Sequence, residues 1–467
     1  MPSADPSGLT AEFWSAVGGD VDGLDSLEIS GRDMWLGGPL PVDDLAIAAI
    51  ATALMAAGGL AAARGATRPV AGLSAEHAAL SFRSERHALV GGVPLGAGFA
   101  PLSRIVRCDG GGWARTHANY PHHAAALGRA LGFDAADQQG AVAALEAAAG
   151  SMDSVALEDA VVAAGGCAAA LRPPEDWASH PAGQAAMAMG LVAWDGGSTT
   201  SSRDLPSPAT ASRPAAGIRV LDLTRVIAGP VAGRTLAALG ADVLRVDPPA
   251  LPELADQHVD TGPGKRTAFL DLADADRREA LLAGADVVLM GYRPGALARL
   301  GLGADELAER HPHLVQVSLC AWGWEGPWAQ RRGFDSLVQL ASGIAAMCAA
   351  PDGSPGVLPA QALDHATGHL MAAAALRGLT WRARGEPVAP ARLSLARTAG
   401  ALLAAPRPAE RATDATDNAD PDSHRASFGD ASLIAPPGTL DGESLSWPHG
   451  PRPLGGDPPA WARSRRR

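Results

Sequence analysis

Two aspartates stand at the start of two alanine-rich segments that resemble each other. Asp44 lies in "LPVDDLAIAAIATALMAAGGLAAARG" and Asp364 in "LPAQALDHATGHLMAAAALRGLTWRARG", and a Leu-Ser pair follows each at the same spacing. Aspartate at the start of a helix most commonly caps backbone N–H groups. The same position stabilises a carboxylate anion and brings amides that can receive a developing oxyanion, as a carboxylate nucleophile requires. Capping and catalysis both stay open on these residues alone.

A few basic residues can bind an anionic ligand. Lys265, in "GPGKRT", is the only lysine of the chain, and it is either a solvated turn residue or an ammonium that binds phosphate. Arg293 and Arg299, in "YRPGALARLG", are either surface charges or phosphate ligands near a helix start. The histidine pairs at 121–123 and 311–313 lack helical i, i+4 spacing, so we expect no metal site there.

A nucleotide-binding loop is a weaker hypothesis. The loop "TRVIAGP" (224–230) follows a predicted strand, and Asp247 ends the next one. A dinucleotide fold places its glycine-rich turn and its ribose-binding acid at these points, but the GxGxxG pattern is absent. We therefore expect an ordinary strand-to-helix turn at 224–230.

The elements that position these residues alternate from residue 217 onward. Apolar β-branched runs alternate with helical patterns, and strand–helix–strand units give parallel sheets. We predict a doubly wound, Rossmann-like α/β domain with its ligand site at the carboxyl ends of the strands. The predicted strands are GIRVLDL (217–223), ADVLRVD (241–247), KRTAFLDL (265–272), ADVVLMG (285–291) and LVQVSLCAWG (314–323). The segment 293–301 is expected to be a loop and a short helix.

Composition shifts divide the chain. A Ser/Thr/Pro-rich stretch at 195–215 is typical of a linker, and a second stretch of low hydrophobicity begins at 405. In the N-terminal part, "SRIVRCDGGGWARTHA" predicts a hairpin, and helices are expected around 122–132, 140–149 and 155–164. We expect an N-terminal mixed α+β part over 1–200, a linker over 201–215, the Rossmann-like domain over 216–404, and a Pro-rich tail over 405–467 that wraps the surface or is loose.

Length and charge limit the class of protein. With 467 residues, more than one domain is expected. The net charge of −12 argues against nucleic acid or an anionic membrane as partner. Four scattered cysteines favour a reducing cytoplasm, and the first residues do not resemble a signal peptide. Residues 45–63 are uncharged and near the length of a membrane span, but they are mostly alanine, so we expect a core helix.

Several motifs resemble one family over about residues 217–401. They include "GIRVLDLTRVIAGPVAGRTLAALGADVLRVDPP", "YRPGALARLG" and "QALDHATGHLMAAAAL", in the family's order. These segments are similar to the family III CoA-transferases, which include formyl-CoA transferase and the α-methylacyl-CoA racemases. The resemblance implies that Asp364 attacks the thioester of an acyl-CoA, forming a mixed anhydride and then an aspartyl-CoA thioester. It also implies coenzyme A or acyl-CoA as substrate without a tightly bound cofactor, a carboxylic acid as second substrate, and a possible homodimer.

Further residues match family positions. Asp335 matches an acid that lies near the nucleophile in transferases and racemases. The positions that resemble the CoA-binding set are Ala228, Leu270, Tyr292, Arg299 and Arg332, joined by Lys265 as a candidate phosphate ligand. For Leu270 and Tyr292, core packing is an equal alternative.

At some positions the residue differs from the family's, and these differences narrow the range of reactions that we expect. Phe334 stands where the racemases have a histidine, and a phenyl ring cannot exchange a proton, so racemase activity is not favoured. Ile227 stands where the oxalate-handling transferases have a glutamine. The family's tetraglycine loop has at best a distant counterpart in "VGGVPLGAG" (90–98).

Residues 1–200 resemble the remaining part of the same family in an unusual order. This order predicts two incomplete copies, in which the first copy supplies the missing end of the second. We expect Asp364 to be the working acid and Asp44 a structural relic that caps its helix. The alternatives to CoA transfer are an acyl-CoA racemase or isomerase, and a non-catalytic CoA-binding protein.

Overall fold

The largest sheet of the protein is parallel. A computed structural model describes residues 8–31, 35–96, 98–137, 139–195, 197–200, 204–205, 210–251, 253–408 and 413–462. The seven strands follow the order β11-β10-β9-β12-β13-β14-β8, and only β8 is antiparallel to its neighbour. The strands are β8 (Ala193–Trp194), β9 (Arg219–Leu223), β10 (Asp242–Asp247), β11 (Lys265–Phe269), β12 (Val287–Met290), β13 (Val315–Cys320) and β14 (Ala391–Ser394). The prediction of a parallel α/β sheet is confirmed.

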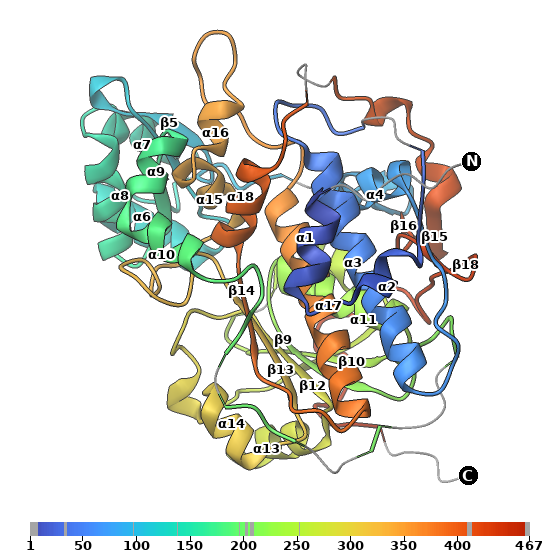
Figure 1. Cartoon of the computed structure of the whole chain (residues 1–467). Coiled ribbons are helices and arrows are strands. Elements are labelled where there is room, and N and C mark those ends of the chain that lie inside the picture. The colour runs from blue at the N-terminus through green and yellow to red at the C-terminus, as the bar shows by residue number, and fades with distance from the viewer. Residues whose placement is uncertain are drawn as a thin grey trace.

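Alternating side chains of these strands enter two separate cores. Val220 and Val243 belong to a large core on one face, whereas Leu221 and Leu244 belong to a smaller core on the other. A strand with both faces covered reads as a continuous apolar run, as "VLDL" does. Figure 1 shows the helices on the two sides of the sheet. The first face carries α11 (Ala228–Ala238) and α17 (Ala362–Ala383), and the second carries α13 (Ala275–Gly284) and α14 (Ala304–Arg310).

The segment 293–301 forms less helix than expected. It contains only the short 3-10 turn η2 (Ala298–Leu300). Gly295 and Gly301 bracket the turn with φ of 72° and 68°, a left-handed conformation that ends a right-handed helix. The segment is therefore mostly a loop after β12.

The repeated segments form the same unit twice. In the first copy, β1 (Leu27–Ser30), α3 (Val42–Ala63) and β2 (Ala71–Ser74) make a parallel β–α–β unit. In the second copy, β13, α17 and β14 do the same. Both long helices have 22 residues and both following strands have 4. The two helices pack against each other, as Figure 1 shows.

The first long helix is strongly apolar. Among the described helices, α3 is the one that is long and apolar enough to cross a membrane, and 89% of its apolar window is buried inside the protein. Its neighbours include α17 and α1 (Gly8–Ala16). The expected core helix over 45–63 is confirmed by this burial.

A separate group of elements follows in the N-terminal part. The predicted hairpin is formed by β5 (Ile105–Arg107) and β6 (Trp113–Thr116), and β7 (Ala168–Ala170) extends it. The expected helices are α6 (Pro121–Leu131), α7 (Ala141–Ala149) and α8 (Ser154–Ala163). Their apolar faces share one small core with the hairpin, and Figure 1 shows them as a lobe beside the main sheet. The chain then crosses back to the main sheet at β8.

The C-terminal residues are better integrated than expected. Strands β15 (Arg425–Phe428) and β16 (Ala431–Ile434) pair with β3 (Leu89–Val90) and β4 (Val93–Pro94) in one sheet. A second sheet joins β17 (Thr439–Leu440) and β18 (Glu443–Ser444) to β1 and β2.

Of the two alternatives for the tail, wrapping the surface or being loose, this pairing contradicts the loose one. Leu433 and Leu440 are 1% and 0% exposed, because the short apolar run after residue 430 contributes strands to sheets whose other strands come from the N-terminal part. Residues 409–412 and 463–467 of the expected tail lie outside the described residues, and so do residues 201–203 and 206–209 of the expected linker.

The remaining helices are α2 (Val21–Leu24), α4 (Ala75–Ser81), α5 (Ser84–His87), α9 (Pro174–Ser179), α10 (Pro181–Ala188), α12 (Ala255–Thr261), α15 (Asp335–Ala341), α16 (Ile344–Met347) and α18 (Leu395–Ala404), with 3-10 turns η1 (Asp109–Gly111), η3 (Thr416–Asn418) and η4 (Pro421–His424).

Candidate active site

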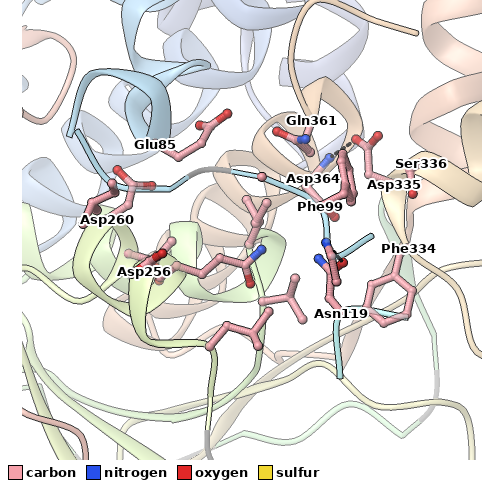
Figure 2. A pocket seen from close by; sticks show the side chains of 18 of the residues that line it. Glu85, Phe99, Asn119, Asp256, Asp260, Phe334, Asp335, Ser336, Gln361 and Asp364 are labelled. Atoms are coloured by element: carbon pink, nitrogen blue, oxygen red, sulfur yellow. Dashed lines mark hydrogen bonds between the residues drawn. The ribbon is translucent and has the colours of Figure 1, made fainter. Parts of the chain in front are cut away.

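A cavity of about 500 Å³ opens where the two halves of the chain meet. The C-terminal half contributes the loop before α11, helix α12 and the first turns of α15 and α17. The N-terminal half contributes Glu85 of α5 and residues between α5 and α6. In Figure 2, Asp335, Asp364 and Gln361 lie together, and Asp256 and Asp260 lie across the cavity from them. Each half supplies part of one cavity wall.

Asp364 stands at the third position of α17, after the N-cap residue Gln361. Its side chain borders the cavity and the residue is 7% exposed. Burial, and then the neighbouring carboxylate of Asp335, raise the pKa of Asp364 well above its usual value. A carboxyl in this setting is held protonated to higher pH than an exposed aspartate. Its ionisation is therefore sensitive to any charge that enters the cavity.

Asp335, the first residue of α15, holds the start of α17 in place. Its Oδ2 accepts hydrogen bonds from the backbone N–H of Leu363 at 2.9 Å and of Asp364 at 3.1 Å, and the Gln339 amide donates to its Oδ1. Burial raises the pKa of Asp335 to about 6, and these hydrogen bonds limit the rise.

The capping role expected for Asp364 therefore belongs to Asp335. The sequence also suggests that the first amides of this helix can receive an oxyanion. Two of them, at Leu363 and Asp364, are already taken by the Asp335 carboxylate. Donors for an oxyanion beside Asp364 have to come from other residues.

The loop between β9 and α11 is strained rather than ordinary. Val226, on the cavity wall, has φ of 69°, which is rare for a β-branched residue. Its N–H donates to Glu253 Oε2 at 2.7 Å, and the same oxygen accepts from Arg245 at the same distance. Backbone strain of this kind occurs mainly at functional sites. Asp247, considered above as a ribose ligand, is bound to Arg245 at 2.8 Å.

Two residues of the N-terminal half that line the cavity were not predicted from the sequence. His117 stacks on Phe334 with ring centroids 3.7 Å apart, so an imidazole lies beside the position where the racemases have their histidine. Asn119 borders the same cavity. The signal in the sequence is the alternation "HAN" after the hairpin strand, since residues two apart in an extended segment share a face.

Lys265 does not face the cavity. The residue is 0% exposed, and its Nζ donates to Asp222 Oδ2 at 2.9 Å and to the carbonyl of Pro230 at 2.8 Å. Burial lowers the pKa of Lys265 to about 8, against the attraction of Asp222. The expectation that this ammonium binds a phosphate is corrected: it is one half of a buried ion pair between β11 and β9.

The other five positions of the expected CoA-binding set lie near one edge of the sheet. Ala228 begins α11, Leu270 follows β11, and Tyr292 follows β12. Arg299 is exposed in η2. Arg332 is half-buried and donates to the carbonyl of Gly165 at 3.0 Å. The carboxyl ends of parallel strands meet at the same edge of a sheet, and ligands bind there in such folds.

The acid of the first copy has a different environment. Asp44 is exposed on the first turn of α3, whereas its neighbour Asp43 is 8% exposed. Asp43 Oδ1 accepts from the N–H groups of Trp35 and Leu36 at 3.1 Å. Burial raises the pKa of Asp43 to about 6. The structural role expected of Asp44 is therefore filled by Asp43, because Asp43 ties the preceding loop to α3.

One part of the chain is similar to known proteins. Residues 215–429 match the family model described as CoA-transferase family III. A probable fatty acyl-CoA transferase of Mycobacterium tuberculosis is 36% identical over 189 residues, which cover 37% of this chain and 48% of the relative. The succinyl-CoA:glutarate CoA-transferase of Mus musculus is 32% identical over 188 residues, covering 37% of this chain and 43% of the relative.

Solved structures match over a similar share. A crystal structure of a hypothetical protein from Mycobacterium tuberculosis is 37% identical, with a TM-score of 0.38, and the match covers 42% of this chain and 58% of that one. The chain spans about half the length of the curated relatives it matches.

Proposed function

We propose, on the premise that residues 215–429 belong to CoA-transferase family III, that this protein transfers CoA from an acyl-CoA to a carboxylic acid through Asp364. The observation that carries the proposal is the Asp364 carboxyl, buried at a helix start on the wall of a cavity and paired with Asp335. A carboxylate nucleophile needs such a position, near a helix N-terminus and shielded from bulk water.

The proposed reaction runs through covalent intermediates on one carboxylate. Asp364 attacks the thioester carbon and the CoA thiolate is expelled. A mixed anhydride between Asp364 and the acyl group remains. The thiolate then attacks the Asp364 carbonyl, giving an aspartyl-CoA thioester and releasing the first acid. A second carboxylate then attacks the aspartyl-CoA thioester, which expels the thiolate and forms a new mixed anhydride with Asp364. The thiolate attacks the carbonyl of the second acid, which gives the new acyl-CoA and frees Asp364. Each step exchanges one activated acid for another, so the protein has mainly to position the reactants and exclude water.

Asp335 is proposed as a positioning residue in this scheme. It bonds the amides of Leu363 and Asp364, which fixes the turn that carries the nucleophile. Its charge also raises the pKa of Asp364. Asp364 has to lose its proton before it attacks, so the exchange rate is expected to increase as the pH rises.

Five residues are proposed to bind the coenzyme along the carboxyl edge of the sheet: Ala228, Leu270, Tyr292, Arg299 and Arg332. The two arginines suit the phosphates of CoA, because guanidinium groups bind phosphate oxygens in pairs. The first residues of α11, beginning at Ala228, add a helix N-terminus to the same edge.

We interpret the whole chain as two partial copies of the family joined into one doubly wound α/β domain with an N-terminal addition. The support is local: α3 and α17 have equal length and equal spacing to the next strand. In addition, β8 of the N-terminal part extends the main sheet, and both halves line the cavity. In this interpretation residues 1–200 supply what the segment 216–404 lacks. Whether two chains also pair as a homodimer is a separate prediction.

Mass spectrometry tests the proposed function directly. The protein is incubated with a panel of acyl-CoAs, and the peptide that contains Asp364 is examined for an added CoA mass. We expect the adduct with at least one acyl-CoA, and hydroxylamine should remove it. An adduct on another residue would overturn the assignment of Asp364. Tight acyl-CoA binding without any adduct or exchange would favour the non-catalytic alternative.

One observation favours racemase or isomerase activity as a second candidate. His117 stacks on Phe334 and borders the cavity with Asp364, so an imidazole and a carboxyl are both available. Incorporation of deuterium at the α-carbon of an acyl-CoA, without an acceptor acid, would select this candidate over CoA transfer.

A further inference from the structure

The proposed reaction creates a negative charge that the structure must accommodate. When Asp364 attacks the thioester, the new C–O bond displaces the carbonyl electron pair onto the thioester oxygen. Hydrogen-bond donors placed at that oxygen commonly make the largest contribution to catalysis of this type. The amides of Leu363 and Asp364 are bound to Asp335, and the side chain of Ile227 has no donor. Other cavity residues have to supply the donors.

His117 is the first of these residues. It is 5% exposed and borders the cavity, and its Nε2 has no hydrogen-bond partner within the described structure. Its Nδ1 lies 3.5 Å from Ser336 Oγ. The Ser336 hydroxyl has no other partner among the described residues, so we assign its proton to this contact. The imidazole proton then lies on Nε2, and the ring is held by stacking on Phe334.

Asn119 is the second. Its Oδ1 accepts a hydrogen bond from the N–H of Ala100 at 3.0 Å and another from Ser103 Oγ at 2.6 Å. These bonds fix which end of the amide is oxygen and which is nitrogen. Asn119 also borders the cavity, and within the described residues its Nδ2 has no acceptor. Asn119 and His117 lie two residues apart after β6, and both border the cavity.

We infer that the Nε2–H of His117 and the Nδ2–H of Asn119 form the oxyanion site for Asp364, so that the N-terminal half provides the donors and the C-terminal half the nucleophile. This inference rests on the proposed function. The two donors stabilise the oxyanion while the C–O bond to Asp364 forms. The carbonyl then re-forms, the C–S bond breaks, and CoA leaves as the thiolate with the bonding pair. The two donors keep their protons throughout.

The electrostatics of His117 agree with a donor rather than a base. Burial, followed by the positive charge of Arg115 and the nearby His123, lowers the pKa of His117 well below its usual value. The ring is therefore neutral at neutral pH. A neutral imidazole of low basicity is a poor group for removing an α-proton, but it remains an effective hydrogen-bond donor.

The test compares substitutions that separate shape from hydrogen bonding. His117→Phe keeps a ring to stack on Phe334 but removes the donor, so we expect kcat for CoA exchange to fall by about 10²-fold, with KM for acyl-CoA changed much less. His117→Gln restores an N–H donor and should recover most of this loss, with the same pH profile as the unsubstituted protein. Asn119→Asp keeps the contacts to Ala100 and Ser103 but removes the donor, and it should also lose about 10²-fold.

A histidine outside the cavity provides the matched control. His424 packs against His77 with ring centroids 4.3 Å apart and the ring planes tilted by 30°, so His424→Phe makes the same chemical change at a packed ring elsewhere. It should exchange CoA at the unsubstituted rate. Thermal unfolding of each variant separates loss of donors from loss of fold, and His117→Gln remains informative if His117→Phe fails to fold.

The outcomes distinguish the inference from the function on which it rests. If the unsubstituted protein forms the Asp364 adduct but His117→Phe and Asn119→Asp exchange CoA within twofold of it, the oxyanion site is wrong and the transferase stands. If the unsubstituted protein neither forms the adduct nor exchanges CoA, the proposed function itself fails. If His117→Phe selectively abolishes α-deuterium incorporation, His117 acts as a base, which also overturns the donor role.

Discussion

The two β–α–β units of this chain differ mainly in what surrounds the first turn of their long helices. In the second copy, Asp364 is 7% exposed and lies against the Asp335 carboxylate on a cavity wall. In the first copy, Asp44 at the equivalent position is exposed, and the preceding residue, Asp43, is turned inward to bond the amides of Trp35 and Leu36. One unit places an acid on the cavity wall, where we propose that it reacts, and the other uses an acid to fasten a loop.

The repeated unit alone therefore does not make a site. The long helix, the strand that follows it and the spacing between them are the same in both copies. The environment of Asp364 comes from Asp335 on α15, in the long connection between β13 and α17, and from residues of the N-terminal half such as His117. Asp44 does not line this cavity.

The largest difference expected between the acids of the two copies is in the rate of CoA exchange. Asp364→Asn should reduce exchange of a labelled acid into acyl-CoA by about 10³-fold or more, because it removes the nucleophile. Asp44→Asn should leave the rate within twofold, since that side chain is exposed on α3. Equal losses in the two variants would mean that the first copy takes part in the chemistry.

A second expected difference concerns how the exchange rate depends on pH, which the neighbouring carboxyls of Asp335 and Asp364 should control. Asp335→Asn keeps an oxygen that can accept from the amides of Leu363 and Asp364 but removes the charge that raises the pKa of Asp364. The rise of exchange rate with pH should therefore move to lower pH, while the plateau rate falls by about tenfold as the first turn of α17 loosens. Asp43→Asn serves as the control and should leave the pH profile unchanged. An unshifted profile in Asp335→Asn would show that the two carboxyls do not interact.

The structural acid of the first copy should affect stability instead. Asp43→Ala leaves the buried amides of Trp35 and Leu36 without their acceptor, so the free energy of unfolding should fall by about 1–3 kcal/mol. Chemical denaturation measures this change. The exchange rate per folded molecule should stay at the unsubstituted value, and a selective loss of activity at full stability would contradict the assignment.

The smallest expected effect is a gain in stability. Burial and Asp335 raise the pKa of Asp364, so the folded state keeps this proton over a pH range in which the unfolded chain loses it. Stability from this group is then fully present below the unfolded pKa and is lost as the pH rises towards the folded pKa. Asp364→Asn removes the titration and should be more stable by about 1 kcal/mol at pH 8, with a smaller difference near pH 4.

Asp44→Asn is the matched control for that measurement. An exposed aspartate should change the free energy of unfolding by less than about 0.5 kcal/mol at either pH. A stability difference for Asp364→Asn that does not vary with pH would contradict the raised pKa of Asp364.

Much of the C-terminal half could be predicted from local sequence patterns. Central strands such as β9 and β12 were predictable because parallel strands covered on both faces form largely apolar runs, and Asp364 stood out through its helix start and its family resemblance. The expected hairpin and helices of the N-terminal lobe were also readable from local patterns. These are properties of neighbouring residues, which a local pattern can record.

How distant residues combine could not be predicted from local patterns and is visible only in the folded chain. The sequence allows Lys265 to be a phosphate ligand, but Asp222, on a different strand, holds the Lys265 ammonium in the interior. His117 and Asn119 reach the cavity beside Asp364 although they belong to the other half of the chain. Burial, ion pairing and cavity walls depend on contacts between segments far apart in sequence. A local pattern can place an acid at a helix start, but the packing of the whole chain sets its exposure and its pKa.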